Sequence, residues 1–256
     1  MSLSPGATVF LAACVFFAGV VDALAGGGGL ITLPAYLAVG LNPALILGTN
    51  KLTSCLGTVV STVRYHRALK FSIKDFLPVI VASMIGSWLG ARAAILVDPS
   101  WIRPMLLAAL PLVAWLVWSK KDFGSVDDSG RLTAAERLRR GVIVAAPIGA
   151  YDGFFGPGTG TFFAIAFARW GKHDLLGATA RAKVLNLVSN MGALGAFMWA
   201  GRLDWKVGLS MSLLSIAGHW VGSHLGVKNG ARLIRPVVAL VCAGLFAKVL
   251  FDAVHG

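Results

Sequence analysis

The chain has 256 residues, of which 57% are hydrophobic and 13% are charged, and its mean hydropathy is +0.77. Soluble domains carry about 25% charged residues, so this composition excludes an ordinary soluble domain and predicts an all-α polytopic membrane protein. The formal net charge of +12 would suggest a nucleic-acid partner in a soluble protein. In a membrane protein, basic loops instead set the topology and contact anionic lipid head groups.

The first apolar run, residues 7–24, predicts a membrane helix. No basic residues precede it, so we interpret it as a span and not as a cleavable signal. The run ends at Gly26, Gly27, Gly28 and Gly29. Each glycine costs a helix roughly 1 kcal/mol relative to alanine, so the helix is expected to break there. The next run, residues 30–39, is too short to cross ~30 Å of hydrocarbon and predicts a half-helix.

Three more apolar segments complete the first half, at about 43–63, 76–96 and 104–118. A long polar stretch, residues 119–140, then joins the two halves. Within it, residues 132–140 predict a short amphipathic helix on the membrane surface, with Thr133 and Glu136 near its start.

The second half repeats this order, with segments at about 141–169, 178–200, 205–227 and 235–254. Its first segment is interrupted by Gly156-Pro157-Gly158, and Asp152 lies 130 residues after Asp22. The sequence therefore predicts two homologous halves, residues 1–118 and 141–256, with about eight transmembrane segments and broken helices at the glycines. Counting each segment as one crossing, the basic residues favour both termini and the central loop on the cytoplasmic side. Whether the halves are parallel or inverted stays open.

The glycine clusters allow two interpretations. Small residues permit close helix packing in membranes. A broken helix also exposes free N–H groups at the positive end of the second helix dipole, which attracts anions. Each cluster follows an acidic residue and would break a helix at membrane depth, where irregular backbone survives only if it is buried or lines a cavity. We therefore favour an anion site.

Two lysines interrupt the apolar sequence in the same pattern. Lys51 is followed by Ser54 and Thr58 at helical spacing, and Lys183 by Asn186 and Asn190. A charge in a spanning segment costs roughly 2.5–3.5 kcal/mol and normally faces a cavity or a partner. The alternative is that both lysines extend to the interface.

The predicted substrate-binding residues are Gly26, Gly27, Gly28, Gly29, Thr49, Asn50, Lys51, Ser54, Gly156, Gly158, Thr159, Gly160, Arg181, Lys183, Asn186 and Asn190.

Asp22 and Asp152 have three interpretations: partners of the lysines, carriers of a coupling proton, or the dyad of an intramembrane protease. The protease also requires a Gly-x-Gly-Asp string, which the chain lacks, and the first two interpretations stay open. His219 and His224 lie five residues apart, whereas metal-binding histidines on a helix are four apart. We interpret them as interhelical hydrogen-bonding residues and predict no metal and no cofactor.

The motifs around these residues resemble the sulfite exporter family TauE/SafE, in its branch of bacterial inner-membrane permeases. The resemblance rests on the glycine run with Leu30-Ile-Thr-Leu-Pro-Ala35, on Gly48-Thr-Asn-Lys-Leu52, on Tyr151-Asp-Gly-Phe-Phe-Gly-Pro157 and on Ala180-Arg-Ala-Lys-Val-Leu-Asn186. It implies around eight segments in two repeats and export of small sulfur-containing anions. Arg181 departs from the family pattern, where a smaller or less charged residue is expected.

The resulting expectation is a secondary transporter, not an enzyme, that exports sulfite, a sulfonate or another small anion, with Asp22 or Asp152 carrying a coupling proton. It would lie in the cell inner membrane as a multi-pass protein. The expected partners are the anion and membrane lipid, with no nucleic acid, and a homodimer is left open. The alternatives are an intramembrane hydrolase using the two aspartates and a non-transporting scaffold.

Overall fold

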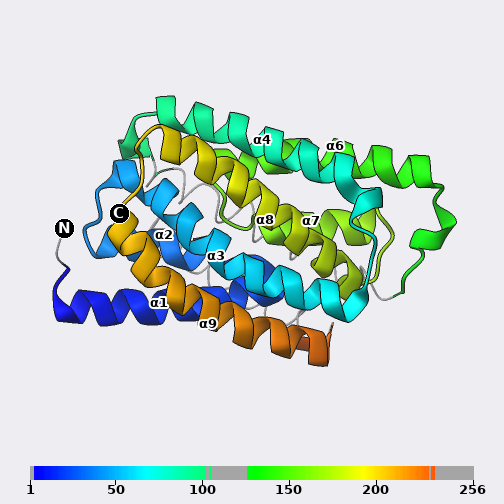
Figure 1. The fold of residues 1–256 in the computed structure, drawn as a ribbon, viewed down its shortest axis with the longest axis horizontal. Helices are drawn as coiled ribbons and strands as arrows, with labels where there is room; N and C mark the ends of the chain where they lie inside the picture. The colour runs from blue at the N-terminus through cyan, green and yellow to red at the C-terminus, as the bar shows by residue number, and fades with distance from the viewer. Residues whose placement is uncertain (1–2, 102–103, 105–125, 231, 234–256) are drawn as a thin grey trace.

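The computed structural model describes residues 3–101, 104, 126–230 and 232–233, and within these ranges every regular element is a helix. The predicted segment at 235–254, nearly all of the segment at 104–118 and the start of the joint between the halves lie outside the described residues. Figure 1 shows the arrangement of the helices. The first half contains α1 (Pro5–Ala25), α2 (Gly29–Ala38), α3 (Pro43–Leu69), η1 (Lys74–Phe76), α4 (Leu77–Leu96) and η2 (Pro99–Trp101). The second half contains η3 (Ser129–Arg131), α6 (Ala134–Phe154), α7 (Thr159–Arg169), α8 (Leu175–Trp199) and α9 (Trp205–Asn229).

Both predicted helix breaks are present. α1 ends at Gly26, which adopts the left-handed conformation with φ 82° and donates its N–H to the carbonyl of Asp22. α2 then has ten residues, a length of about 15 Å, or half the hydrocarbon thickness. The same break separates α6 from the eleven-residue α7. By length and composition alone, α1 and the stretch Lys74–Leu96 qualify as membrane spans.

The prediction of a separate short helix over residues 132–140 is wrong. α6 begins at Ala134 and continues without interruption to Phe154, so those residues form its first two turns. Thr133 and Glu136 do form a capping box, in which each side chain accepts the other residue's backbone N–H. The helix extends beyond its apolar part because this cap satisfies its first donors in the polar region.

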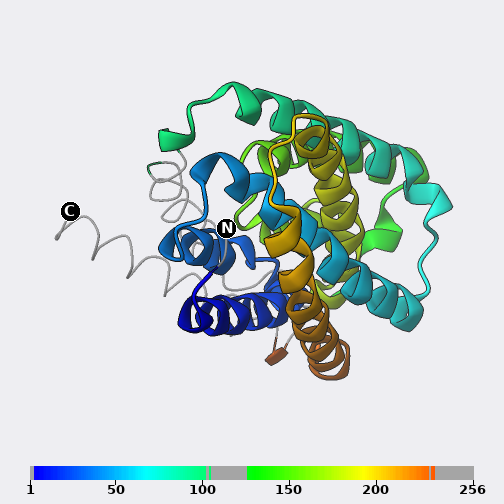
Figure 2. The ribbon, with the colours of Figure 1, turned by 60° about the vertical axis from the view of Figure 1, so that its left-hand side comes forward.

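Hydrogen bonds between the central helices fix their relative directions. Thr62 of α3 donates to the carbonyl of Lys183 on α8 at 3.0 Å, and Lys51 donates to Asn190 at 3.1 Å. Residue numbers rise along α3 as they fall along α8, so the two helices are antiparallel. Figures 1 and 2 show α3 beside α8 near the middle of the bundle.

The remaining long helices follow one of these two directions. α9 is parallel to α1, because residue numbers rise together along the two helices where they touch. A Cβ added to Gly218 would lie 2.2 Å from the carbonyl oxygen of Phe16, and one added to Gly222 would lie 2.4 Å from that of Val20. α3 also runs with α9, and α4 runs with both α6 and α8. Each long helix of the first half corresponds to the helix about 130 residues later, as α1 corresponds to α6. The two helices of each such pair run in opposite directions. The two halves are inverted.

Basic residues gather at one end of the bundle, which we call the basic end. Figure 1 shows that α3, α7 and α9 end there and that α4, α6 and α8 begin there. Its described Lys and Arg residues are Arg64, Arg67, Lys70, Lys74, Arg131, Arg137, Arg139, Arg140, Arg169, Lys172, Arg181, Lys228 and Arg232. Among the described residues, the opposite end has Arg92, Arg202 and Lys206. The N-terminus lies at the opposite end, away from the described part of the joint. The expectation that the N-terminus and the joint share a side is therefore wrong, because α2 returns the chain to the end where α1 began.

Candidate functional site

The two glycine breaks touch each other. A Cβ added to Gly26 would lie 2.3 Å from the carbonyl carbon of Gly160, and one added to Gly160 would lie 2.6 Å from the Cα of Gly26. Only glycine permits such an approach and also the positive φ of Gly26. The end of α1 thus crosses the start of α7, and the predicted convergence of the two breaks is present in the structure.

A backbone group on each side of the first break is bound within the protein. Thr161 of α7 donates to the carbonyl of Ala25 at 2.5 Å, which satisfies the end of α1. The N–H of Gly28, at the start of α2, donates to the carboxylate of Asp22 at 3.2 Å. One turn along α2, Thr32 donates to Asn50 of α3 at 2.5 Å. A carboxylate of the protein therefore lies at the positive end of the α2 dipole.

Each buried lysine is paired with the aspartate of the other half. Lys51 Nζ lies 2.8 Å from Asp152 Oδ1, with side-chain exposures of 3% and 2%. Lys183 Nζ donates to the backbone carbonyl of Asp22 and lies 3.4 Å from its Oδ2. The alternative in which both lysines extend to the interface is wrong, because both ammonium groups are enclosed. The geometry agrees with the interpretation of the aspartates as lysine partners.

His219 joins this cluster from α9. Its Nε2 lies 3.0 Å from Asp22 Oδ2, and its Nδ1 lies 2.9 Å from the carbonyl oxygen of Ser215. His219 therefore links Asp22 to the backbone of α9. The sequence indicated only an interhelical hydrogen bond for His219, and α9 supplies no motif that links it to Asp22.

The second half differs at the matching position. Gly158 adopts the left-handed conformation with φ 81°, whereas Gly28 is helical with φ −55°. Pro157, which has no N–H, stands where the first half has Gly27. Among the described residues, Asp152 Oδ2 is buried and has no hydrogen-bond partner. Lys51 therefore contacts one oxygen of Asp152, and the other oxygen has no donor among the described residues.

Several other predicted site residues lie in the interior of the bundle. Asn190, Thr159 and Gly29 lie at the centre: Asn190 binds Lys51, Thr159 donates to the carbonyl of Gly156 at 2.6 Å, and a Cβ on Gly29 would lie 3.5 Å from Pro157. Asn186 is buried and Ser54 is half-buried.

Thr49 and Arg181 lie elsewhere. Thr49 accepts the N–H of Asp204 at 2.8 Å and so holds the start of α9 at the opposite end. Arg181 donates to the carbonyl of Gly177 and lies over the ring of Phe71 at the basic end. Arg181 and Lys183 are two positions apart on a helix and therefore point in different directions.

Broken helices that meet between inverted halves, with buried charges beside the breaks, are features found in membrane transporters. The family model described as sulfite exporter TauE/SafE matches residues 11–249, so the chain belongs to that family.

Curated relatives agree with this assignment. The chain is 39% identical over 246 residues to "Probable membrane transporter protein ORF9" of Sinorhizobium sp, which covers 96% of this chain and 93% of the relative. It is 36% identical to "Probable membrane transporter protein YfcA" of Escherichia coli strain K12, covering 93% and 87%. A "Probable membrane transporter protein" of Haemophilus influenzae is 36% identical, with 93% of each chain covered. No solved structure gives a significant match to the chain.

Proposed function

We propose that the protein is a secondary transporter that exports a small oxyanion, sulfite or a sulfonate, across the cell inner membrane. The observation that carries the proposal is the pair of buried lysines beside the crossing of two broken helices, each held by a carboxylate of the other half. The description of the family as sulfite exporters supports the choice of anion.

In this proposal the two carboxylates take the place of the substrate while the site is closed. Asp22 accepts from Gly28 and contacts Lys183, which are the donors that a small oxyanion would use. An anion that displaces the carboxylate gains the same partners. Because the halves are inverted, the two clusters would exchange roles as the protein opens first to one side and then to the other.

We assign the coupling proton to Asp152. Its Oδ2 has no donor among the described residues, whereas Asp22 Oδ1 accepts from the N–H of Gly28 and Asp22 Oδ2 accepts from Lys183. A proton on Asp152 would neutralise the carboxylate and release Lys51 to bind the anion. The positive-inside rule supports an orientation of the protein in the membrane: the basic end would face the cytoplasm, and the start of α1 would face the outside.

The test is sulfite efflux from proteoliposomes containing the purified protein. Lys51→Met and Lys183→Met remove the proposed anion ligands and should each lower the initial rate at least tenfold. Lys206→Met is the matched control, because Lys206 is exposed at the opposite end, and its rate should stay within twofold of the natural protein. Undiminished efflux in the Lys51→Met, Lys183→Met double variant would overturn the binding model.

Proton coupling is tested with the same vesicles. In the natural protein an imposed pH gradient should change the efflux rate, and in Asp152→Asn that response should disappear. Asp22→Asn serves as the comparison and should impair transport while any residual flux still responds to the gradient. A full response in Asp152→Asn would assign the proton elsewhere.

A further inference from the structure

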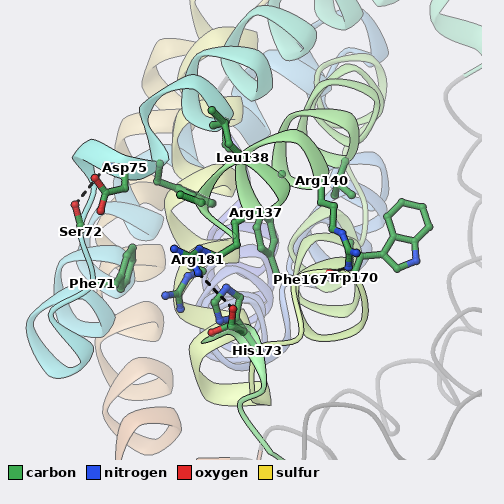
Figure 3. A pocket seen from close by; sticks show the side chains of 18 of the residues that line it. Phe71, Ser72, Asp75, Arg137, Leu138, Arg140, Phe167, Trp170, His173 and Arg181 are labelled. Carbon is green, nitrogen blue, oxygen red and sulfur yellow. Dashed lines mark hydrogen bonds between the residues drawn. The ribbon is translucent and has the colours of Figure 1, made fainter. Parts of the chain in front are cut away.

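A second site lies at the basic end, away from the glycine breaks. A pocket of about 650 Å³ opens among the starts of α4 and α6, the end of α7 and the start of α8. Neither the glycine breaks nor the two buried lysines line it. Its volume is typical of small-molecule sites, which span about 300–1,000 Å³. In Figure 3, Arg137, Arg181 and His173 lie near one another, Arg140 lies beside Trp170, and Ser72 and Asp75 lie on the other side.

Three arginines of the pocket are anchored by the backbone. Arg137 donates to the carbonyl of Leu132 at 2.7 Å, Arg140 to that of Trp170 at 2.9 Å, and Arg181 to that of Gly177 at 3.1 Å. Each of these bonds uses the Nη1 group, and a guanidinium has five N–H donors in all. Within residues 3–101 and 126–230, no carboxylate forms an ion pair with any of the three. The one acid that lines the pocket, Asp75, is exposed.

His173 adds a buried polar group near Arg181. Its side chain is 6% exposed, and its Nδ1 has no hydrogen-bond partner among the described residues, with Asp127 Oδ2 at 3.6 Å. Burial and the neighbouring Arg181 lower the pKa of His173 to about 4, against the raising effect of Asp127 and Asp174. At neutral pH the ring is uncharged and can donate or accept one hydrogen bond into the pocket.

The walls of the pocket indicate its depth in the membrane. Trp170 is 54% exposed at its rim, and tryptophan is enriched at the level of the lipid head groups. Phe71, Phe76 and Phe167 supply an apolar surface beside the arginines. The pocket therefore combines fixed cationic donors with apolar walls at the membrane interface.

We propose that this pocket binds a tetrahedral or pyramidal oxyanion of the phosphate, sulfite or sulfonate type through Arg137, Arg140 and Arg181. Planar guanidinium groups bind such oxyanions through paired, charge-assisted hydrogen bonds. Two sources share this chemistry: the phosphate of an anionic lipid head group, and a soluble anion at the cytoplasmic entrance. The site stands whether or not the central lysines carry transport, because it rests on separate residues.

The experiment measures equilibrium binding to the purified full chain, so it does not depend on flux. In neutral detergent, inorganic phosphate and sulfite are titrated separately while intrinsic tryptophan fluorescence is followed, with Trp170→Phe used to identify the local signal. In nanodiscs, quenching by brominated phosphatidylglycerol is compared with quenching by brominated phosphatidylcholine.

Arg137→Gln and Arg181→Gln should each weaken binding at least tenfold. Arg139→Gln is the matched control, because Arg139 lies between the pocket arginines on α6, is exposed and does not line the pocket; its affinity should change less than twofold. If Arg181→Gln fails to fold, Arg137→Gln, which changes an exposed residue, still tests the site. Arg181→Lys, which keeps the charge, should recover part of the affinity.

The source of the anion follows from which arm responds. Saturable binding of phosphate or sulfite in neutral detergent supports a soluble ligand. Preferential quenching by phosphatidylglycerol that Arg137→Gln removes supports a lipid head group. Binding in neither arm, or equal loss in Arg139→Gln and Arg137→Gln, would overturn the proposal.

Discussion

Replacing Lys51 with methionine tests the asymmetry between the two ion pairs. Lys51 is the only described cation paired with Asp152, and both side chains are almost fully enclosed. Removing one partner of such a pair leaves an uncompensated buried charge and costs about 3–5 kcal/mol. Lys51→Met is therefore expected to lower the free energy of unfolding by about that amount.

Lys183→Met provides the matched comparison. Asp22 keeps the N–H of Gly28 and the contact with His219 after Lys183 is removed. The loss should be nearer the about 1–3 kcal/mol of a broken hydrogen bond. A difference of about 2 kcal/mol between the two variants is roughly 30-fold in the ratio of folded to unfolded protein.

The assay is reversible unfolding in mixed micelles, followed by circular dichroism as sodium dodecyl sulfate is titrated. The double variant Lys51→Met, Asp152→Asn removes both charges and should regain most of the lost stability. The reasoning is refuted if Lys183→Met costs as much as Lys51→Met, or if the double variant is no more stable than Lys51→Met alone.

Three further predictions concern the crossing, the pocket and the topology. Gly26→Ala should prevent folding, since its Cβ would meet the Gly160 backbone at a positive φ, whereas Gly195→Ala, with open space around its Cβ, should leave the yield and thermal midpoint unchanged. The pKa of His173 falls from 6.5 to about 4 on folding, so the unfolded chain binds more protons between these values and thermal stability should fall as the pH drops from about 6.5 to about 4. His173→Gln should flatten that dependence, and an unchanged slope would exclude His173 as its source. A cysteine at Ala68, near the basic end, should resist a membrane-impermeant thiol reagent added outside intact cells, and one at Ser100 should react; the reverse pattern would invert the proposed topology.

Local chemistry made the helix breaks predictable. Glycine runs disfavour helix wherever they occur, so the bounds of α2 and α7 follow from the sequence alone. The position of Lys51 and Lys183 in apolar runs left open whether they are buried or extend to the interface, and only the polar stripe that both share favoured burial.

Long-range pairing was not predictable in the same way. His219 and Asp22 lie 197 residues apart, and nothing local links them. The crossed pairing of lysines and aspartates depends on the inversion of the halves, which the loop charges could not resolve because α2 and α7 change the number of crossings. The separation of Arg181 from Lys183 was available from helix periodicity, since two positions correspond to about 200° of rotation.

The crossed ion pairs also have a consequence for biogenesis. While the first half is being inserted, Lys51 has no access to Asp152 and Asp22 has none to Lys183, because both partners are still untranslated. Each isolated charge costs roughly 2.5–3.5 kcal/mol on insertion scales. The charges on α1 and α3 are therefore paired only after α6 and α8 have been synthesised and inserted.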